Sequence, residues 1–471
     1  MTGRKWAGKA RVAVAGVVLA ATGVLTVTFV SSGGKGTADA ATELSQYVPI
    51  QRVAPAARKP TPGRNAATGR AVVDCGTNRN GKFSPDNPVA QPGIKNGAEH
   101  VHDFVGNLAI TATSSDAELA ASGTTCRNGD RSSYFWPVLR VDPAVRPGSA
   151  GTRQALARTV PNVSCPRVGD RVPAGRRAAV ARWLAELDRL TSAANVRMND
   201  SRGRVDAAFN ASVIEPLRAK RAELISAISR SAYGRSGQLV SLVDCDVSYD
   251  SMHKYMPSHS HSATPGGATP PAPQPSSSAL PEPQGKNLEL PNNTGGIQRP
   301  RSVLIEYRGN AKSKVVAMPR FLRALTGDAK PTSRGPANAR PSWTCSGFGD
   351  RLSDKYPICP SGSLVQRVHD FPGCWDGKNI DSANHRSHLA FADAASGACP
   401  SGTKAIPQLR ITLSYAIPRE QQVRGQFALD SFPEEDHNPF SDHDDFVNVN
   451  SERQMKRIVA AINSGRTIRA A

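Results

Sequence analysis

Residues 409–415 read Leu-Arg-Ile-Thr-Leu-Ser-Tyr, and residues 302–307 read Ser-Val-Leu-Ile-Glu-Tyr. In the first stretch apolar and polar residues alternate, which places the apolar side chains on one side of an extended chain. The second stretch is rich in β-branched and aromatic residues, and both therefore predict β-strands. A third strand-like run covers residues 133–140, with Pro137 expected at an edge or a bulge. These strands predict a β-rich domain.

Between the predicted strands the apolar period changes to that of helices. In residues 176–197, apolar side chains recur every three or four positions, at Val180, Trp183, Leu184, Leu187, Leu190 and Ala194. A second helical pattern follows with Leu217, Leu224, Ile225 and Ile228, and Pro216 is expected to begin or kink that helix. The two helices predict an antiparallel hairpin inserted into the β-rich domain for structural reasons.

The predicted fold class is α+β and β-rich: a single mixed or antiparallel β domain interrupted by a helical-hairpin insertion and a Pro/Ser-rich linker. The linker composition cannot bury enough apolar surface to fold alone. The predicted segments are a signal peptide (1–40), a flexible lead-in (41–70), the first part of the domain (71–140), the insertion (141–250), a disordered linker (251–300), the second part of the domain (301–450), and a terminal helix and tail (451–471).

The amino-terminus has the layout of a secretory signal. Basic residues at positions 4 to 11 precede an uncharged apolar run over 12–30, and Ala38-Asp39-Ala40 supplies a small-residue cleavage site. The run is also long enough to span a bilayer as an uncleaved anchor. We expect a secreted, extracellular protein without a membrane segment after cleavage. Association with the cell wall is the alternative location.

Export makes the eight cysteines informative. They are even in number, widely spaced and without a Cys-x-x-Cys pair. In an oxidising compartment this pattern predicts up to four disulfides rather than a zinc site. Sequence does not fix the connectivity, but the simplest expectation is sequential pairing of 75 with 126, 165 with 245, 345 with 359, and 374 with 399.

The charge balance favours acidic partners. The formal net charge is +20, and five basic residues and one acidic residue in the first 40 positions account for +4 of it, leaving +16. Such an excess favours acidic cell-wall polymers, anionic membrane surfaces or nucleic acid. Aromatic residues make up only 6% of the chain and the basic residues are not striped, so nucleic acid is discounted. We expect a monomer whose partner is an extracellular polysaccharide or an acidic cell-wall polymer.

Polar and aromatic residues crowd most densely into 369–388, which reads His-Asp-Phe-Pro-Gly-Cys-Trp-Asp-Gly-Lys-Asn-Ile-Asp-Ser-Ala-Asn-His-Arg-Ser-His. The stretch has no apolar period to bury, so we expect a loop that presents these side chains to a ligand. Other polar blocks read Glu-His-Val-His-Asp-Phe-Val-Gly (99–106), Tyr-Phe-Trp-Pro (134–137) and His-Asp-Asp-Phe (443–446).

In chain order, the blocks 99–106, 134–137, Cys-Trp-Asp-Gly-Lys-Asn (374–379), His-Arg-Ser-His (385–388) and 443–446 together resemble the domain-of-unknown-function family nineteen ninety-six of secreted bacterial and fungal proteins. The resemblance covers about 85–140 and 300–450, with 141–300 as an extra insertion. It implies no established activity, although fungal members are often joined to carbohydrate-binding modules, which points to extracellular polysaccharide. Family members usually follow the last His-x-Asp-Phe with Asn-Gly-Trp, whereas Phe446 is followed here by Val-Asn-Val-Asn, so a ligand contact by that tryptophan is in question.

The histidines suggest a metal. His100 and His102 are two apart and face the same side of a strand, while His385 and His388 suit one face of a helical turn. Distant clusters can converge on one divalent metal, which would activate water for hydrolysis or, as copper, handle oxygen. The predicted ligands are His100, His102, His388 and His443. A tract with Met252, His253, Met256, His259 and His261 is interpreted mainly as polar linker, with weak metal binding as the alternative.

Carboxylates offer a metal-free alternative. Asp376, beside Trp375 and Lys378, could serve as a glycosidase acid or base with Asp370, Asp381 or Asp445 as partner. A polysaccharide lyase would use His388 or His102 as base, with Lys378 and Arg386 neutralising a uronate. The predicted catalytic set is His100, His102, Asp376, Lys378, His388, His443 and Asp445.

Three interpretations without catalysis stay open. Turn residues of these types often only hydrogen-bond the local backbone. The protein could bind the wall without catalysis, stacking sugars on Trp375 or Trp136, or it could bind a metal without turnover. The sequence lacks Gly-x-Ser-x-Gly, His-Glu-x-x-His and phosphate-loop motifs, which weakens serine hydrolase, zincin and nucleotide-binding hypotheses.

Overall fold

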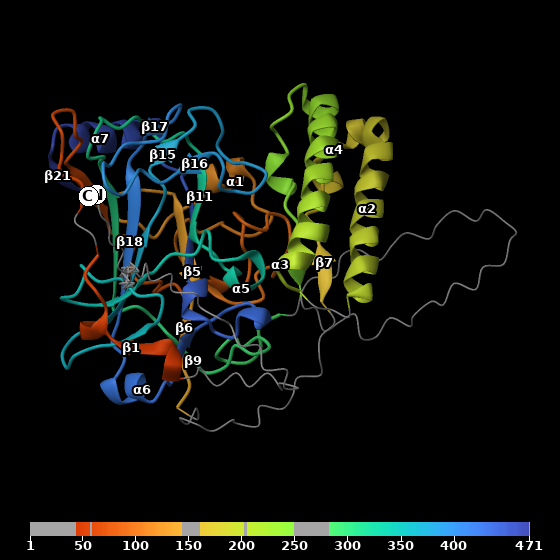
Figure 1. The fold of residues 1–471 in the computed structure, drawn as a ribbon. Helices are drawn as coiled ribbons and strands as arrows, with labels where there is room; N and C mark the ends of the chain where they lie inside the picture. Colours follow the sequence, from red (N-terminus) through yellow and green to blue (C-terminus); the bar gives the residue numbers. More distant parts are fainter. Residues whose placement is uncertain (1–43, 57–58, 144–160, 202–204, 249–281, 471) are drawn as a thin grey trace, which may run out of the picture. The chain divides into compact units, whose positions relative to one another are not determined.

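The computed structural model describes residues 44–56, 59–143, 161–201, 205–248 and 282–470. Its β domain is built on two large sheets (Figure 1). The six-stranded sheet has the order β12 (Trp343–Cys345), β14 (Val365–Asp370), β18 (Gln408–Tyr415), β10 (Ser302–Arg308), β2 (Arg70–Val73) and β21 (Thr467–Ala470). The five-stranded sheet has the order β11 (Arg323–Gly327), β20 (His443–Val447), β5 (Ser133–Pro137), β4 (His102–Gly106) and β3 (Phe83–Ser84).

The main core joins the two sheets. Along β18 the residues Leu409, Ile411 and Leu413 are buried while the intervening side chains are partly exposed, as the alternation predicted. They belong to the same apolar cluster as Tyr134 of β5 and Phe446 of β20. The five-stranded sheet is buried on its other face too, where a second cluster contains Phe104, Phe135, Leu325 and Val447. Both faces of this sheet are therefore covered by protein.

The remaining elements are short, apart from the long helices of the insertion and α7. Small sheets are formed by β1 (Tyr47–Pro49) with β13 (Tyr356–Ile358), by β16 (Leu389–Ala390), β15 (Cys374–Trp375) and β17 (Lys404–Ala405), by β19 (Phe427–Leu429), β6 (Leu139–Val141) and β9 (Gly296–Gln298), and by β7 (Asn162–Ser164) with β8 (Asp246–Ser248). The helices are α1 (Asp116–Ala121), α2 (Arg177–Asp200), α3 (Ala207–Phe209), α4 (Glu215–Tyr233), α5 (Pro331–Arg334), α6 (Arg419–Val423) and α7 (Glu452–Asn463).

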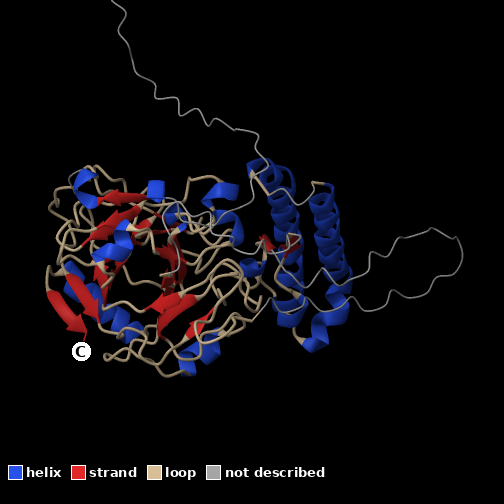
Figure 2. Ribbon diagram, turned by 90° about the horizontal axis from the view of Figure 1, so that it is seen from below, coloured by secondary structure: helices blue, strands red, loops and turns tan. Residues whose placement is uncertain are grey.

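The insertion forms the expected helical hairpin. Figures 1 and 2 both show α2 and α4 side by side. Val180 near the start of α2 shares an apolar cluster with Ile228 near the end of α4, and Met198 at the end of α2 shares another with Leu217. This pairing makes the helices antiparallel. A π-helical turn over Asn210–Ile214 leads into α4, so Pro216 stands in the first turn, where a missing N–H is tolerated.

All eight cysteines form disulfides in the expected sequential order: Cys75–Cys126, Cys165–Cys245, Cys345–Cys359 and Cys374–Cys399. The second bridge joins the two ends of the insertion, as predicted. The fold class is confirmed: the β domain is mixed, because β2 and β21 run parallel while the other neighbours in the two large sheets are antiparallel. Four disulfides fit an extracellular protein.

The structure differs from three of the predicted segments, the lead-in, the linker and the tail. The lead-in is not flexible throughout, since β1 pairs with β13 and Ile50 is fully buried. The predicted linker ends before β9, because the carbonyls of Asn287, Leu288 and Gly295 accept hydrogen bonds from buried Arg140. The tail contains a strand, β21, after α7. Within the described ranges no helix is long and apolar enough to cross a membrane. The signal segment and the Met/His tract lie outside these ranges.

Candidate functional site

The site lies on the face of the five-stranded sheet turned away from the main core. His102 begins β4 and His443 begins β20, with β5 between them. His102 pairs with Pro137, and continuing the register of β20 on β5 by two residues places His443 opposite Pro137 as well. The two histidines therefore flank one short proline side chain in a single row. His100 precedes β4 and turns to the same side, as its spacing from His102 predicted.

Three imidazoles converge above this row. Nε2 of His443 lies 3.2 Å from Nε2 of His100 and 3.4 Å from Nε2 of His102. Nδ1 of His443 lies 2.9 Å from the carbonyl oxygen of Ser441, so it donates there and leaves the Nε2 lone pair directed at the other two rings. The potential ligand atoms of the three residues all lie within 4.8 Å of one another.

All three imidazoles are held in the neutral form. Burial lowers the pKa of His100 and His102 well below the usual value, and neighbouring imidazoles lower it further. Burial lowers the pKa of His443 to about 4. The rings also pack on aromatic side chains, since His102 lies edge-on to Phe135 and His100 edge-on to Phe432. At neutral pH each ring therefore has a nitrogen lone pair available, which is the form that binds metals.

The opposite side of β20 carries a separate, fully buried ionic group. Arg367 donates to both carboxylate oxygens of Asp442. His369 Nε2 lies 2.9 Å from Asp442 and its Nδ1 lies 3.0 Å from Asp444. Burial alone would raise the pKa of Asp442, but Arg367 and His369 outweigh it and hold that pKa far below the usual range. This group anchors the strand from behind.

The geometry of His369, Asp442 and Asp444 would also permit a metal. Two observations favour an ionic group instead. Both ring nitrogens of His369 face carboxylates, which suits an imidazolium without a free lone pair. Burial opposes this charge, but Asp442 and Asp444 outweigh it and raise the pKa of His369 to about 9. The guanidinium of Arg367 already supplies a cation to Asp442.

This charge makes stability depend on pH. His369 has a pKa of about 9 in the folded chain and an ordinary value of 6.5. Its stabilisation is therefore complete below pH 6.5 and is lost as the pH rises through 9, on the order of 3 kcal/mol in total. Urea unfolding with the disulfides intact should show this fall between pH 6 and 9.5. In the His369→Gln variant it should be clearly smaller; an equal fall in both proteins would contradict the assignment.

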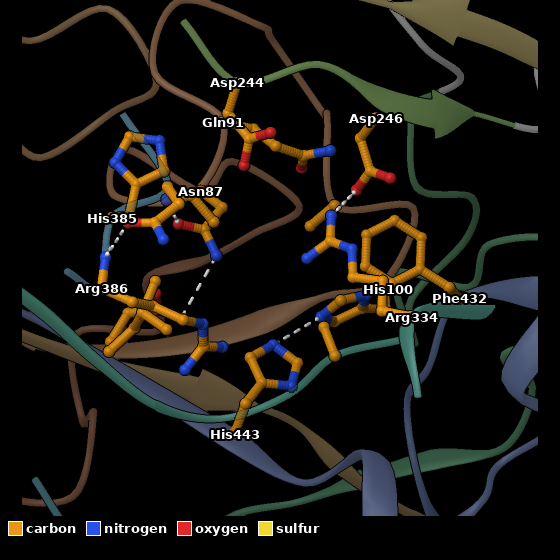
Figure 3. A pocket seen from close by; sticks show the side chains of 16 residues that line it. Asn87, Gln91, His100, Asp244, Asp246, Arg334, His385, Arg386, Phe432 and His443 are labelled. Carbon is orange, nitrogen blue, oxygen red and sulfur yellow. Dashed lines mark hydrogen bonds and ion pairs between the residues drawn. The ribbon is translucent and has the colours of Figure 1, made fainter. Parts of the chain in front are cut away.

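A pocket opens beside His100 and His443 of the three-histidine group (Figure 3). It holds about 520 Å³ of empty space, counted out into the solvent. Asp445 follows His443 by two residues on β20, so its side chain faces the same side. Its Oδ2 accepts a hydrogen bond of 3.2 Å from Asn87, and burial, followed by Asp444, raises its pKa to about 8. The wall includes Asn87, His100, Arg334, Arg386, His443 and Asp445.

The end of the insertion supplies part of the wall. Asp246, the first residue of β8, lies 2.8 Å from the guanidinium of Arg334 and 3.3 Å from Nζ of Lys330. Lys330 is almost fully buried, contacts Glu434 at 3.0 Å and donates to the carbonyl of Val247. Asp244, on the other side of Cys245, also lines the pocket. The insertion therefore shapes the site as well as the surface.

The 381–386 loop forms the opposite wall. His385 adopts a positive φ of 54°, and its Nδ1 lies 3.0 Å from Oδ1 of Asp381. Its Nε2 is buried and has no hydrogen-bond partner among the described residues. Arg386 donates through Nη2 to the carbonyl of Gly327, at 2.6 Å.

The structure separates the predicted site residues into two groups. His100, His443 and Asp445 line the pocket, and His102 joins them through its contact with His443. His388 is not in the histidine group, because its Nε2 donates to the carbonyl of Arg323 and its Nδ1 contacts Ser382. Asp376 accepts bonds from the backbone of Lys378 and Asn379 and shapes a turn, while the Lys378 side chain is exposed. None of His388, Asp376 and Lys378 lines the pocket.

The carboxylates considered as partners of Asp376 are also engaged. Asp370 pairs with Arg410, and Asp381 holds His385. Trp136 is fully buried in the main core, so it cannot stack on a sugar. Trp375 is partly buried and donates to the carbonyl of Asn379. Most polar side chains of 369–388 are thus engaged in contacts within the fold, and of this stretch residues 384–386 line the pocket.

Several residues around the pocket were not singled out from sequence. Asp244 and Asp246 flank a disulfide cysteine in the insertion, and Asn87 and Arg334 lie in turn-rich stretches without a motif. The only available signal was the pair of acidic residues beside Cys245. Arg367 carried no signal either, because an arginine inside a strand pattern normally indicates a solvent-facing position.

The fold and the site define a disulfide-linked, β-rich protein with a buried three-histidine group at the edge of a polar pocket. Residues 286–449 match the family model described as Domain of unknown function (DUF1996). This match confirms the resemblance predicted from the motifs. The 99–106 and 134–137 blocks lie outside the matched range, although β4 and β5 carry them beside β20. The search of curated proteins and the search of solved structures found no match.

Proposed function

We propose that this protein is a metal-dependent hydrolase whose metal, zinc, is held by His100, His102 and His443. The observation that carries the proposal is the convergence of three buried, neutral imidazoles on one point beside a pocket. Their Nε2 separations from His443 are 3.2 and 3.4 Å. Zinc–nitrogen bonds of about 2.0–2.1 Å in a tetrahedral arrangement require separations of roughly 3.3–3.4 Å.

The donor set supports zinc and hydrolysis. Three protein ligands with a further position open to a pocket are the usual arrangement of catalytic zinc, and such an ion lowers the pKa of bound water toward 7. Copper binds imidazoles at least as strongly, so the choice of metal depends on the test below. Phe104 and Phe135 stack beneath the histidines with ring centroids 4.7 Å apart and keep water from that side.

Asp445 is the residue placed to move a proton. It projects from β20 on the same side as His443 and lines the pocket. The amide of Asn87 fixes one carboxyl oxygen, which leaves the other for water or a leaving group. Because burial raises the pKa of Asp445 to about 8, the carboxyl is mostly protonated at neutral pH; in this proposal it gives its proton to the leaving group, while the proton of the attacking water passes to solvent.

The substrate we propose is an extracellular polysaccharide, and the net charge of +16 after position 40 supports an acidic polymer. Glycosidases need two carboxyl groups facing each other across the bond. Asp376 lies in a turn outside the pocket, and the other carboxylates that line the pocket with Asp445 are ion-paired, Asp244 with Arg218 and Asp246 with Arg334 and Lys330. An ester or amide substituent of the polymer therefore fits the site better than its glycosidic bonds.

Metal removal and restoration test the proposal. We expect one zinc per chain after dialysis, release of acid or amine from acetylated or esterified wall glycans, loss of turnover with a chelator, and its return with zinc. Asp376→Ala should retain both metal and turnover. A chain that binds no metal, or turnover that survives chelation, would contradict the proposal, whereas one bound metal without turnover would leave a binding protein.

A further inference from the structure

The pocket contains the guanidinium of Arg386, which interacts electrostatically with Asp328 and Asp445 but forms no direct ion pair among the described residues. Arg386 donates to the carbonyl of Gly327, and in the described part of the chain no carboxylate lies within ion-pair distance of it. Arg334, the other arginine of the pocket wall, is paired with Asp246. Because a guanidinium has five N–H donors, most of those of Arg386 remain available.

The position of this guanidinium relates it to the three-histidine group. Gly327 pairs with His443 across β11 and β20. The bond to the Gly327 carbonyl therefore holds Arg386 above the strand end that carries His443. Figure 3 shows the Arg386 guanidinium extending toward His443.

A second group beside it also lacks a partner. Nε2 of His385 is buried and unbonded among the described residues, while Asp381 fixes the ring through Nδ1. The backbone of His385 has a positive φ, a conformation that residues other than glycine seldom adopt. The adjacent positions 385 and 386 thus present two nitrogen groups with free hydrogen-bonding capacity to one pocket.

We propose that Arg386, with His385 beside it, forms a subsite for a carboxylate of the substrate, next to the proposed metal position. A planar carboxylate matches the fork of a guanidinium with two parallel hydrogen bonds. Asp244 and Asp246 also line the pocket. These two aspartates are paired with Arg218, Arg334 and Lys330, so they leave Arg386 free.

This inference rests on the proposed function, since the carboxylate is that of its substrate. It names the substrate class as a polysaccharide with acidic sugars, such as uronates. The acid would sit at Arg386 while the bond to be cleaved faces the histidines. Neutral glycans would lack this contact and bind less well.

Glucuronate is the probe for the test, with glucose and inorganic phosphate as comparisons. Calorimetric titration should show glucuronate binding to the zinc-loaded and the metal-free protein. In Arg386→Gln its affinity should fall at least about tenfold, because a charge-assisted hydrogen-bond pair is lost. Arg386→Lys should be intermediate, since it keeps the charge without the fork. Arg453→Gln, which changes an exposed arginine of α7, should bind as the wild type does.

Each other result has a distinct meaning. Unchanged glucuronate binding in a folded Arg386→Gln protein would overturn the subsite, and so would tighter binding of phosphate than of glucuronate. Glucuronate binding that vanishes when zinc is removed would place the carboxylate on the metal and also overturn it. If no zinc binds but glucuronate binding still depends on Arg386, the subsite stands and the proposed hydrolase falls.

Discussion

Replacing His443 by alanine should lower the zinc affinity of the protein at least about 100-fold. His443 Nε2 is the atom that both His100 and His102 approach, so its loss leaves two imidazoles without the third corner of the site. Substitutions of residues that only support a metal ligand already reduce affinity roughly 10- to 100-fold, and a direct ligand should exceed that. Competition with a chromophoric chelator measures the change.

The matched control is His388→Ala. His388 is also a buried histidine, but its ring nitrogens contact Arg323 and Ser382, so we expect it to keep wild-type zinc affinity. Both variants should be made in a background with His253, His259 and His261 changed to serine, because that tract could bind metal weakly. Equal affinities of the His443→Ala and His388→Ala proteins would refute the assignment of the ligands.

Replacing Arg367 by methionine should lower the free energy of unfolding by about 3–5 kcal/mol. The guanidinium is fully buried and pairs with the equally buried carboxylate of Asp442. Removing it leaves Asp442 with His369 and Ser342 but without its main cation. A buried charge left without its partner costs more free energy of unfolding than the removal of both charges of the pair. Urea unfolding at pH 7 gives the difference.

Two further variants test this explanation. Arg70→Met removes an arginine from the same six-stranded sheet whose side chain is 53% exposed, so it should cost less than about 1 kcal/mol. Adding Asp442→Asn to Arg367→Met should recover part of the loss, because the stranded charge disappears. The explanation fails if Arg367→Met costs no more than Arg70→Met, or if the second substitution brings a further loss.

The regular elements could be predicted where burial leaves a period. Residues 409–415 alternate because β18 buries one face, and the long helices of the insertion show a three- and four-residue period for the same reason. The short strands β1 and β21 could not be predicted, because three or four residues give no period. Their pairing depends on β13 and β2, which are far away in sequence.

The spacing of residues could relate two ligands only where they lie two apart on an extended segment, as His100 just before β4 and His102 at its start do. The spacing of His100 and His102 was sufficient to place both on one side. For His388 the spacing argument assumed a helical turn, but His385 adopts a positive φ and the loop directs His388 toward Arg323. No spacing relates the insertion to the pocket, because Asp246 reaches it through contacts with Lys330 and Arg334.

The two faces of β20 have one more consequence. Asp442 and Asp444 are fixed on one side by Arg367 and His369, while His443 and Asp445 project on the other. Because the strand is anchored in this way, it does not need to move when a ligand binds, and the imidazole of His443 already occupies its binding position. The site is thus preorganised, and binding free energy that a loose loop would spend on ordering remains available for affinity and for selecting a metal of the right size.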